Sequence, residues 1–170
     1  MKTIGLIGGM SWESSSKYYR IINETVREKL GGLHSAKVLM YSVDFDEIES
    51  LMQEGKWEEI SRLMVAVAQK LENGGADVIL ICTNTIHKTA EEVQKNIGVP
   101  LLHIADATAE KIKESGFGKI GLLGTRVTME DTFYKGRLID KYGLQVLIPE
   151  EPDREVVNQV IFEELCLGII

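Results

Sequence analysis

The sequence predicts an α/β fold of two similar lobes, each a parallel sheet with helices on both faces, of which the second lobe is incomplete. Short apolar runs alternate along the chain with amphipathic stretches of helical length, a pattern typical of parallel sheets with helical connections. The apolar stretch Ile4–Gly8 is echoed at Ile120–Gly124, and the order of elements after each copy matches. We therefore expect a first lobe over residues 1–104 and a partial second lobe over residues 105–170.

Hydrophobic periodicity and glycine or proline breaks define the elements of the first lobe. The predicted strands are Thr3–Ile7, Lys37–Val43, Asp77–Cys82 and Leu101–Ile104. The predicted helices are Ser14–Lys29, Asp46–Glu54, Trp57–Asn73 and Ile86–Lys95. The first of these helices is expected to pack through one apolar side, formed by Tyr18, Ile21, Ile22 and Val26.

The second lobe is expected to repeat this order in a shorter form. Its predicted helices are Ala107–Ser115, Glu130–Tyr142 and Asp153–Leu165, and its predicted strands are Ile120–Gly124 and Leu144–Ile148. Gly8 and Gly124 are separated by 116 residues. Applied to Cys82, this offset places a counterpart at about position 190–200, so we expect the second lobe to be unfinished at Ile170.

Composition excludes several classes of protein. Hydrophobic residues make up 44% and charged residues 26%, which is typical of a soluble globular protein. The net charge of −7, without a basic patch, argues against nucleic acid as a partner. No signal peptide or membrane-spanning run is visible, and two cysteines without a secretory context indicate reduced thiols, so we expect a cytoplasmic protein.

Cofactor and metal sites are also not expected. The stretch after the first strand, GLIGGMS, lacks the spacing of the dinucleotide fingerprint, and the chain has no Walker sequence. The histidines show no metal-ligand spacing with one another or with the cysteines. They are His34, His87 and His103.

The candidate site lies where three predicted strands end, because ligands bind beyond the carboxyl ends of parallel strands. The stretches that meet there are Gly8–Ser14, Ser42–Asp46 and Cys82–Thr85. Their hydroxyl and amide side chains suit a carboxylate or phosphate at a helix N-terminus. These side chains belong to Ser11, Ser14, Thr83, Asn84 and Thr85.

Cys82 stands at the end of a buried strand, immediately before three polar residues. A cysteine at a helix N-terminus would have a lowered thiol pKa and could act as a base or nucleophile. The alternative is that Cys82 is a small buried packing residue. His87 could serve as a general base or could simply cap and solvate its helix. We expect Cys166 to be a packing residue in an amphipathic helix, and His34 and His103 to be ordinary surface or core residues.

Four segments together resemble the aspartate/glutamate racemase superfamily, whose members work without pyridoxal phosphate. In chain order they are MKTIGLIGGMSWESS, YSVDFDEIE, GADVILICTNTIHK and KIGLLGTRVTM. The resemblance covers essentially the whole chain, and ICTNTIHK is its most specific part. It implies two α/β lobes facing each other across a cleft, a homodimer, a small amino-acid substrate and no cofactor.

The resemblance also implies a two-cysteine mechanism. One thiolate removes the α-proton while a thiol on the opposite face of the substrate donates a proton, and Cys82 corresponds to the first of these groups. The implied substrate-binding residues in the first lobe are Met10, Ser11, Thr83, Asn84 and Thr85. In the corresponding loop of the second lobe they are Thr125 and Thr128.

Two departures from the family pattern affect the expected function. The family's second cysteine sits in a GCTE-like strand end, which these 170 residues do not contain, so we expect these residues alone to be inactive or impaired. Aspartate-specific members place an arginine after the second strand, where this chain has Asp44, Asp46, Glu47 and Glu49. A broad or non-aspartate substrate range is therefore expected. The alternatives are a non-catalytic module for carboxylate binding or dimerisation, and a single-cysteine decarboxylase or isomerase of the same superfamily.

Overall fold

The computed structural model describes residues 1–169, so the last residue of the predicted second lobe, Ile170, lies outside the described residues. The chain divides into two compact units. Unit 1 comprises Met1–Thr83 and Thr89–Leu102, and unit 2 comprises Asn84–Lys88 and the chain from His103 onward. Over residues 1–169, no helix combines the length and the apolar character needed to span a membrane.

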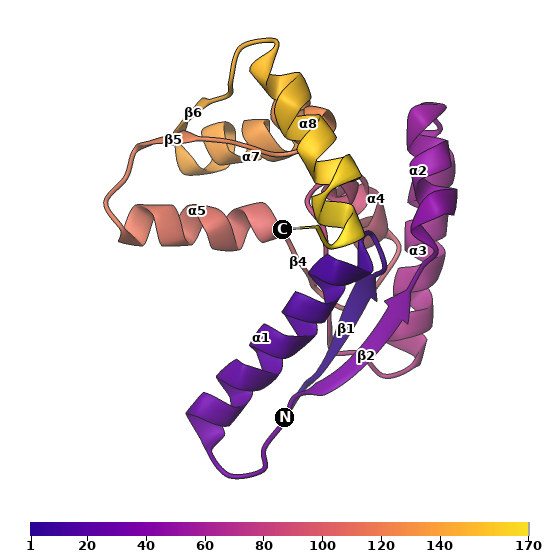
Figure 1. Ribbon diagram of the computed structural model, residues 1–170. Coiled ribbons are helices and arrows are strands. Elements are labelled where there is room, and N and C mark those ends of the chain that lie inside the picture. The colour runs from indigo at the N-terminus through magenta and orange to yellow at the C-terminus, as the bar shows by residue number, and fades with distance from the viewer. Residues whose placement is uncertain (170) are drawn as a thin grey trace. The chain divides into compact units, whose positions relative to one another are not determined.

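Unit 1 is built on a four-stranded parallel sheet with the strand order β2-β1-β3-β4. The strands are β1 (Thr3–Gly8), β2 (Lys37–Ser42), β3 (Val78–Ile81) and β4 (Leu101–Leu102). The helices are α1 (Trp12–Leu30), α2 (Phe45–Gln53), α3 (Trp57–Asn73) and α4 (Ala90–Lys95). Figure 1 shows α1 on one side of β1 and β2, and α2 and α3 on the other. The predicted α/β fold with parallel strands and helices on both faces is confirmed.

The core of unit 1 forms between the two central strands and α3. Leu6 and Ile7 of β1 are fully buried, as the apolar run of a central parallel strand predicts. On α3 the buried residues recur every three or four positions, which points one apolar stripe at the sheet. They are Ile60, Met64, Val67, Ala68 and Leu71.

One of the four residues predicted for the packing side of α1 lies elsewhere, whereas Tyr18, Ile22 and Val26 are partly buried. Ile21, which was expected on its packing side, is 60% exposed, and Ser15 is the buried residue of α1. The side of α1 that faces β1 includes Ser15. A Cβ atom added to Gly8 of β1 would lie only 2.8 Å from the Oγ of Ser15. Ile21 projects about 100° away from its neighbour Ile22 around the helix, which takes it off this side.

Unit 2 contains a second parallel pair of strands, β5 (Lys119–Gly121) and β6 (Gln145–Leu147). Its α-helices are α5 (Ile104–Glu114), α6 (Arg126–Glu130), α7 (Thr132–Tyr142) and α8 (Asp153–Glu163). Short 3-10 helices form at Thr85–Thr89 (η1) and Leu165–Leu167 (η2). Strand β1 contains the whole of Ile4–Gly8, whereas β5 ends at Gly121 and includes only the first two residues of the predicted strand Ile120–Gly124.

Two predicted helices are interrupted in the structure. The stretch expected as Glu130–Tyr142 divides at Asp131, whose extended backbone and side chain cap the start of α7. The stretch expected as Ile86–Lys95 begins as η1 and becomes α-helical at Ala90. The predicted strand Leu101–Ile104 is also shorter, because His103 caps α5 and Ile104 is already helical.

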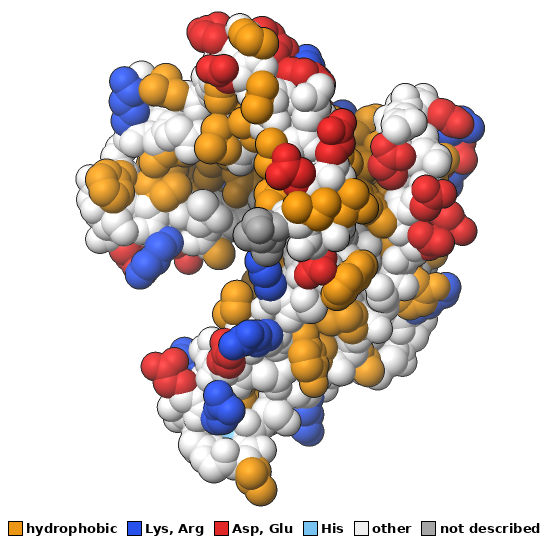
Figure 2. All heavy atoms as spheres, in the orientation of Figure 1, with side chains coloured by type: hydrophobic (Ala, Val, Ile, Leu, Met, Phe, Trp, Pro, Cys, Tyr) orange, Lys and Arg blue, Asp and Glu red, His pale blue; other side chains and the backbone are white. Residues whose placement is uncertain are grey.

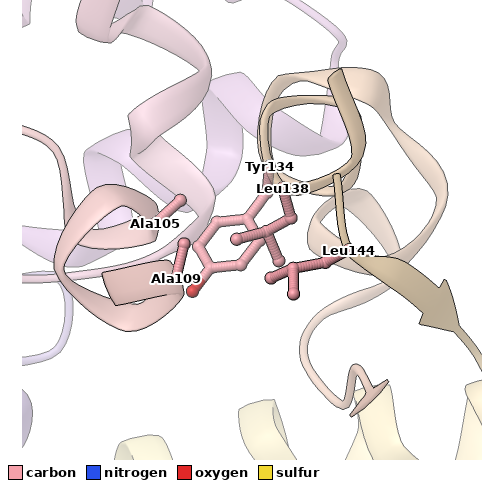
Figure 3. Close-up of a cluster of buried hydrophobic side chains, with 5 residues drawn as sticks. All are labelled: Ala105, Ala109, Tyr134, Leu138 and Leu144. Carbon is pink, nitrogen blue, oxygen red and sulfur yellow. The ribbon is translucent and has the colours of Figure 1, made fainter. Parts of the chain in front are cut away.

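The core of unit 2 is a cluster of five buried residues from α5, α7 and the start of β6. In Figure 3 the ring of Tyr134 lies against the two alanines of α5, with the leucines beside it. The small side chains on α5 leave room for the ring to approach the helix closely. The cluster comprises Ala105, Ala109, Tyr134, Leu138 and Leu144.

Gly9 is required by both its backbone conformation and its surroundings. Its φ of +98° is rarely adopted by residues with a side chain, and a Cβ atom there would lie 2.3 Å from the carbonyl oxygen of Val43. We expect Gly9→Ala to lower the free energy of unfolding by about 2–3 kcal/mol, because the ends of β1 and β2 must separate. Urea unfolding measures the change.

Gly32→Ala is the matched control for this prediction. Gly32 also has a positive φ, of +56°, but a Cβ atom there would meet nothing within 4 Å. The control should cost about 1 kcal/mol, which is the backbone penalty alone. Equal losses in the two variants would contradict the close approach of Gly9 to Val43.

Candidate functional site

The ends of β1, β2 and β3 form the candidate site of unit 1. The amide of Cys82 donates a hydrogen bond to the carbonyl oxygen of Ile7 at 2.9 Å, so strand pairing continues one residue beyond β3. The amide of Val43 donates to the carbonyl oxygen of Gly8 at 3.0 Å. The carboxyl ends of the three strands therefore lie level with one another, as a ligand site in a parallel sheet requires.

Two serines in the first turn of α1 fix this arrangement. The Oγ of Ser14 donates to the carbonyl oxygen of Cys82 at 2.7 Å. The Oγ of Ser15 accepts from the amide of Gly9 at 2.9 Å and donates to the carbonyl oxygen of Ser11 at 3.1 Å. The loop after β1 and the backbone of Cys82 are thus both tied to the same helix terminus.

Met10 and Ser11, two of the predicted substrate-binding residues, lie in this loop and are buried. Ser11 is the N-cap residue of α1 with an extended backbone, and within the described chain its hydroxyl makes no capping hydrogen bond to the helix. The first amides of a 19-residue helix stand next to this hydroxyl. Such a helix terminus favours a carboxylate or another anion.

Cys82 is buried, with 1% of its surface exposed, and burial raises the pKa of its thiol to about 12. The predicted lowering of this pKa is therefore wrong. The residues that follow Cys82 do not begin an α-helix: Thr83 and Asn84 form a bend, and α4 starts only at Ala90. Desolvation of the thiolate by burial therefore decides the direction of the shift.

Three threonine hydroxyls meet in unit 2 and form a polar cluster of their own. The Oγ1 atoms of Thr85 and Thr125 are 2.9 Å apart, and those of Thr125 and Thr128 are 3.1 Å apart. Thr85 and Thr128 complete the triangle at 3.4 Å. All three were predicted from the sequence, and we call them the threonine cluster.

Local structure explains the positions of Thr125 and Thr128. Thr125 is the N-cap residue of α6, and its Oγ1 accepts a hydrogen bond from the amide of Thr128 at 3.3 Å. Thr128 packs closely on Gly124, where a Cβ atom would lie 3.0 Å from the threonine methyl group. A glycine at position 124 therefore lets the loop after β5 approach the threonine side chain.

The segment Asn84–Lys88 brings Thr85 into unit 2. Asn84 is exposed, and its carbonyl oxygen accepts from the amide of His87 at 3.0 Å. Lys88 forms an ion pair with Asp131 at 2.5 Å, and this contact lowers the pKa of the Asp131 carboxyl group. The Lys88 side chain therefore attaches the segment to the start of α7.

Sequence reasoning missed a pair of buried histidines in unit 2. The rings of His87 and His103 have centroids 4.6 Å apart. His87 accepts a hydrogen bond through Nε2 from the amide of Ile104, and His103 accepts through Nδ1 from the amide of Ala105, both at 3.2 Å. Burial, together with His87, Arg137 and Lys141, lowers the pKa of His103 to about 3. His103 is the N-cap residue of α5, and its position just before a helical pattern was the signal in the sequence for this role.

The structure thus groups the predicted site residues into two sets. Unit 1 holds Met10, Ser11, Cys82 and Thr83, and unit 2 holds Asn84, Thr85, Thr125 and Thr128. Cys166 lies in η2 and is partly exposed, rather than in the amphipathic α-helix expected for it. Over residues 1–169, no group of three or more His, Cys, Asp or Glu side chains is arranged to hold a metal ion.

Comparison with known proteins gives consistent matches. The family model for Asp/Glu/Hydantoin racemase matches residues 7–166. The chain is 28% identical over 171 residues to the broad specificity amino-acid racemase RacX of Bacillus subtilis (strain 168), covering 93% of this chain and 69% of RacX. These matches confirm the resemblance that the sequence motifs indicate.

Solved structures give the same result. A candidate Asp/Glu racemase from Yersinia pestis is 58% identical, with a TM-score of 0.92, over 100% of this chain and 74% of that chain. An aspartate racemase homologue from Pyrococcus horikoshii OT3 is 38% identical, with a TM-score of 0.83, over 99% of this chain and 74% of that chain.

Proposed function

The chain belongs to the Asp/Glu/hydantoin racemase family, a family of isomerases that act on small amino-acid substrates, and we propose that Cys82 exchanges the α-proton of an amino acid without a cofactor. The observation that carries this proposal is the position of Cys82. It lies at the carboxyl end of β3, paired with the end of β1 and fixed by Ser14.

The proposed chemistry is general acid–base catalysis by a thiol. The Cys82 thiolate takes the α-proton, and the electron pair of the C–H bond passes into the substrate carboxylate. The thiol then returns a proton to the carbanion. Because burial raises the thiol pKa, Cys82 is well suited to donate a proton at neutral pH. The positive α-ammonium group of a bound amino acid would favour the thiolate form of Cys82. The thiolate could then remove the α-proton.

We propose that polar groups of the site residues bind the carboxylate group of the substrate. Ser11 stands at the N-terminus of α1, where amides and the helix dipole favour an anion. The threonine cluster offers three hydroxyl groups that can donate hydrogen bonds. We assign substrate binding to Met10, Ser11, Thr83, Asn84, Thr85, Thr125 and Thr128.

Inversion of the α-carbon requires a second acid–base group on the opposite face of the substrate. Cys166 is a poor candidate, because it lies in η2 and not at the end of a strand. We therefore propose that Cys82 exchanges the α-proton from one face of the substrate.

The proposed substrate range is broad and not restricted to aspartate. Asp44 is the N-cap of α2, and Asp46 and Glu47 lie in the first turn of that helix, close to the end of β2. Figure 2 shows acidic side chains gathered over α2 and the start of α3. Acidic groups near the end of β2 would repel an acidic substrate side chain and accept a neutral one.

Isotope exchange tests the proposed function. The purified protein in heavy water should replace the α-proton of at least one amino acid in a broad panel of both enantiomers, as followed by NMR. Loss of the α-proton signal without inversion would agree with one-face chemistry. No exchange with any amino acid would refute the proposal, and ligand-induced stabilisation without exchange would indicate a non-catalytic binding module.

A second candidate function is a single-cysteine decarboxylase or isomerase. The observation that favours it is the raised pKa of Cys82, because these reactions need a thiol that protonates a carbanion and no second cysteine. In a decarboxylation the C–C bond breaks, CO₂ leaves, and Cys82 supplies the proton. Malonate-type and maleate-type acids in the same assay would distinguish these reactions from racemisation.

We further propose that the protein is a cytoplasmic homodimer. Cys82 and Cys166 are both in the thiol form, which suits a reducing compartment. The dimer follows from the family resemblance. Sedimentation equilibrium at several concentrations would measure the oligomeric state.

A further inference from the structure

His87 is a buried side chain that the proposed chemistry leaves without a role. It is 2% exposed, and its Nε2 accepts a hydrogen bond from the amide of Ile104 at 3.2 Å. The next amide along α5, that of Ala105, donates to His103 at the same distance. Two imidazoles therefore accept the first two amides of α5, and one of them comes from the segment just after Cys82.

This contact acts together with two other links that hold the segment Asn84–Lys88 in unit 2. Thr85 hydrogen-bonds within the threonine cluster, and Lys88 pairs with Asp131 in the loop before α7. His87 supplies the third link, to the start of α5. The three side chains reach three different elements of unit 2, so together they fix both the position and the orientation of a short segment that has no α-helical hydrogen bonds.

We propose that His87 is a positioning residue that holds the Thr85 hydroxyl in the threonine cluster by accepting the Ile104 amide. Thr85 lies two residues before His87 in η1, and a tilt of this short helix would move its hydroxyl away from Thr125. The proposal rests on the proposed function, because it assigns the threonine cluster to substrate binding. Within that function His87 affects binding and leaves the proton transfer at Cys82 unchanged.

The chemistry of the contact explains why the residue is a neutral histidine. The amide of Ile104 needs an acceptor, which a neutral imidazole nitrogen provides and a protonated one does not. A charged ring would also stand at the positive end of α5, beside the ring of His103. Glutamine can place an oxygen near the position of Nε2, whereas phenylalanine keeps a ring but offers no acceptor.

The test compares His87→Gln with His87→Phe, and uses His34→Gln and His34→Phe as controls at an exposed histidine. Amide hydrogen exchange at Ile104 reports the anchor, and steady-state α-proton exchange reports KM and kcat. We expect His87→Phe to speed exchange of the Ile104 amide by about tenfold or more and to raise KM by about tenfold with kcat nearly unchanged. His87→Gln should restore both values, and the controls should match the unchanged protein.

Several results would overturn the proposal. Faster amide exchange in His87→Phe with KM unchanged would show a purely structural contact, and a fall in kcat alone would place His87 in the proton transfer. Normal amide protection in His87→Phe would show that no anchor exists. If the unchanged protein exchanges no substrate α-proton, the proposed function fails and the positioning role fails with it, whereas the amide measurement still decides whether His87 anchors the segment.

Discussion

Replacing Cys82 by alanine is expected to lower the rate of α-proton exchange by about 10²–10⁴-fold, the usual contribution of a general acid–base group. The thiol is the proposed proton carrier, and alanine removes it without adding a polar atom to a buried site. Cys166→Ala, which changes the cysteine in η2, should leave the rate within about twofold of the unchanged protein. NMR exchange assays in heavy water measure both variants.

Folding must be checked alongside this comparison, because Cys82 is part of the core. Removing a buried sulfur costs about 1 kcal/mol through the cavity it leaves, which a urea titration would resolve. Cys82→Ser gives a second test, since a serine hydroxyl is a much weaker acid than a thiol and should also be slow. Exchange at an undiminished rate in a folded Cys82→Ala variant would remove Cys82 from the mechanism.

The parallel sheet could be predicted from the sequence because buried strands carry a strong local signal. Thr3–Ile7 and Trp57–Asn73 were predicted within one residue of β1 and α3, since apolar runs and a regular stripe leave little choice. Ile21 was misplaced because apolar character alone does not show which side of an amphipathic helix meets the sheet. That side is set by the close approach of Gly8 and Ser15, a contact between two elements.

The sequence indicated candidate site residues more readily than it indicated the pKa of the Cys82 thiol. Strand ends indicated Cys82 and Thr85, and the family resemblance indicated Thr125 and Thr128; their roles in a site stay predictions. The pKa of Cys82 depends on burial by residues distant in sequence, and a local argument from an expected helix gave the wrong direction. The pairing of His87 with His103 joins residues far apart in sequence, so no local pattern could reveal it.

The second large effect is expected from His103, as a loss of stability in acid. Its pKa is about 3 in the folded protein, against an ordinary value of 6.5. Between these values the unfolded chain binds a proton that the folded protein does not, so stability falls as pH decreases through this range. Lowering the pH from 7 to 4 should therefore cost about 2–3 kcal/mol through His103 alone.

His103→Asn isolates this contribution, because asparagine is also a good N-cap residue and does not titrate. Its side-chain oxygen can accept the amide of Ala105 in place of Nδ1. Protonation of Asp106 and Asp131, whose pKa values are lowered by cationic partners, also destabilises the fold in acid, but equally in both proteins. Urea unfolding at pH 7 and pH 4 should thus show a smaller acid loss in His103→Asn than in the unchanged protein or in His34→Asn. Burial of His103 beside His87, Arg137 and Lys141 should keep it from taking up a proton in the folded state. An equal loss of unfolding free energy in acid for the unchanged protein, His103→Asn and His34→Asn would contradict this expectation.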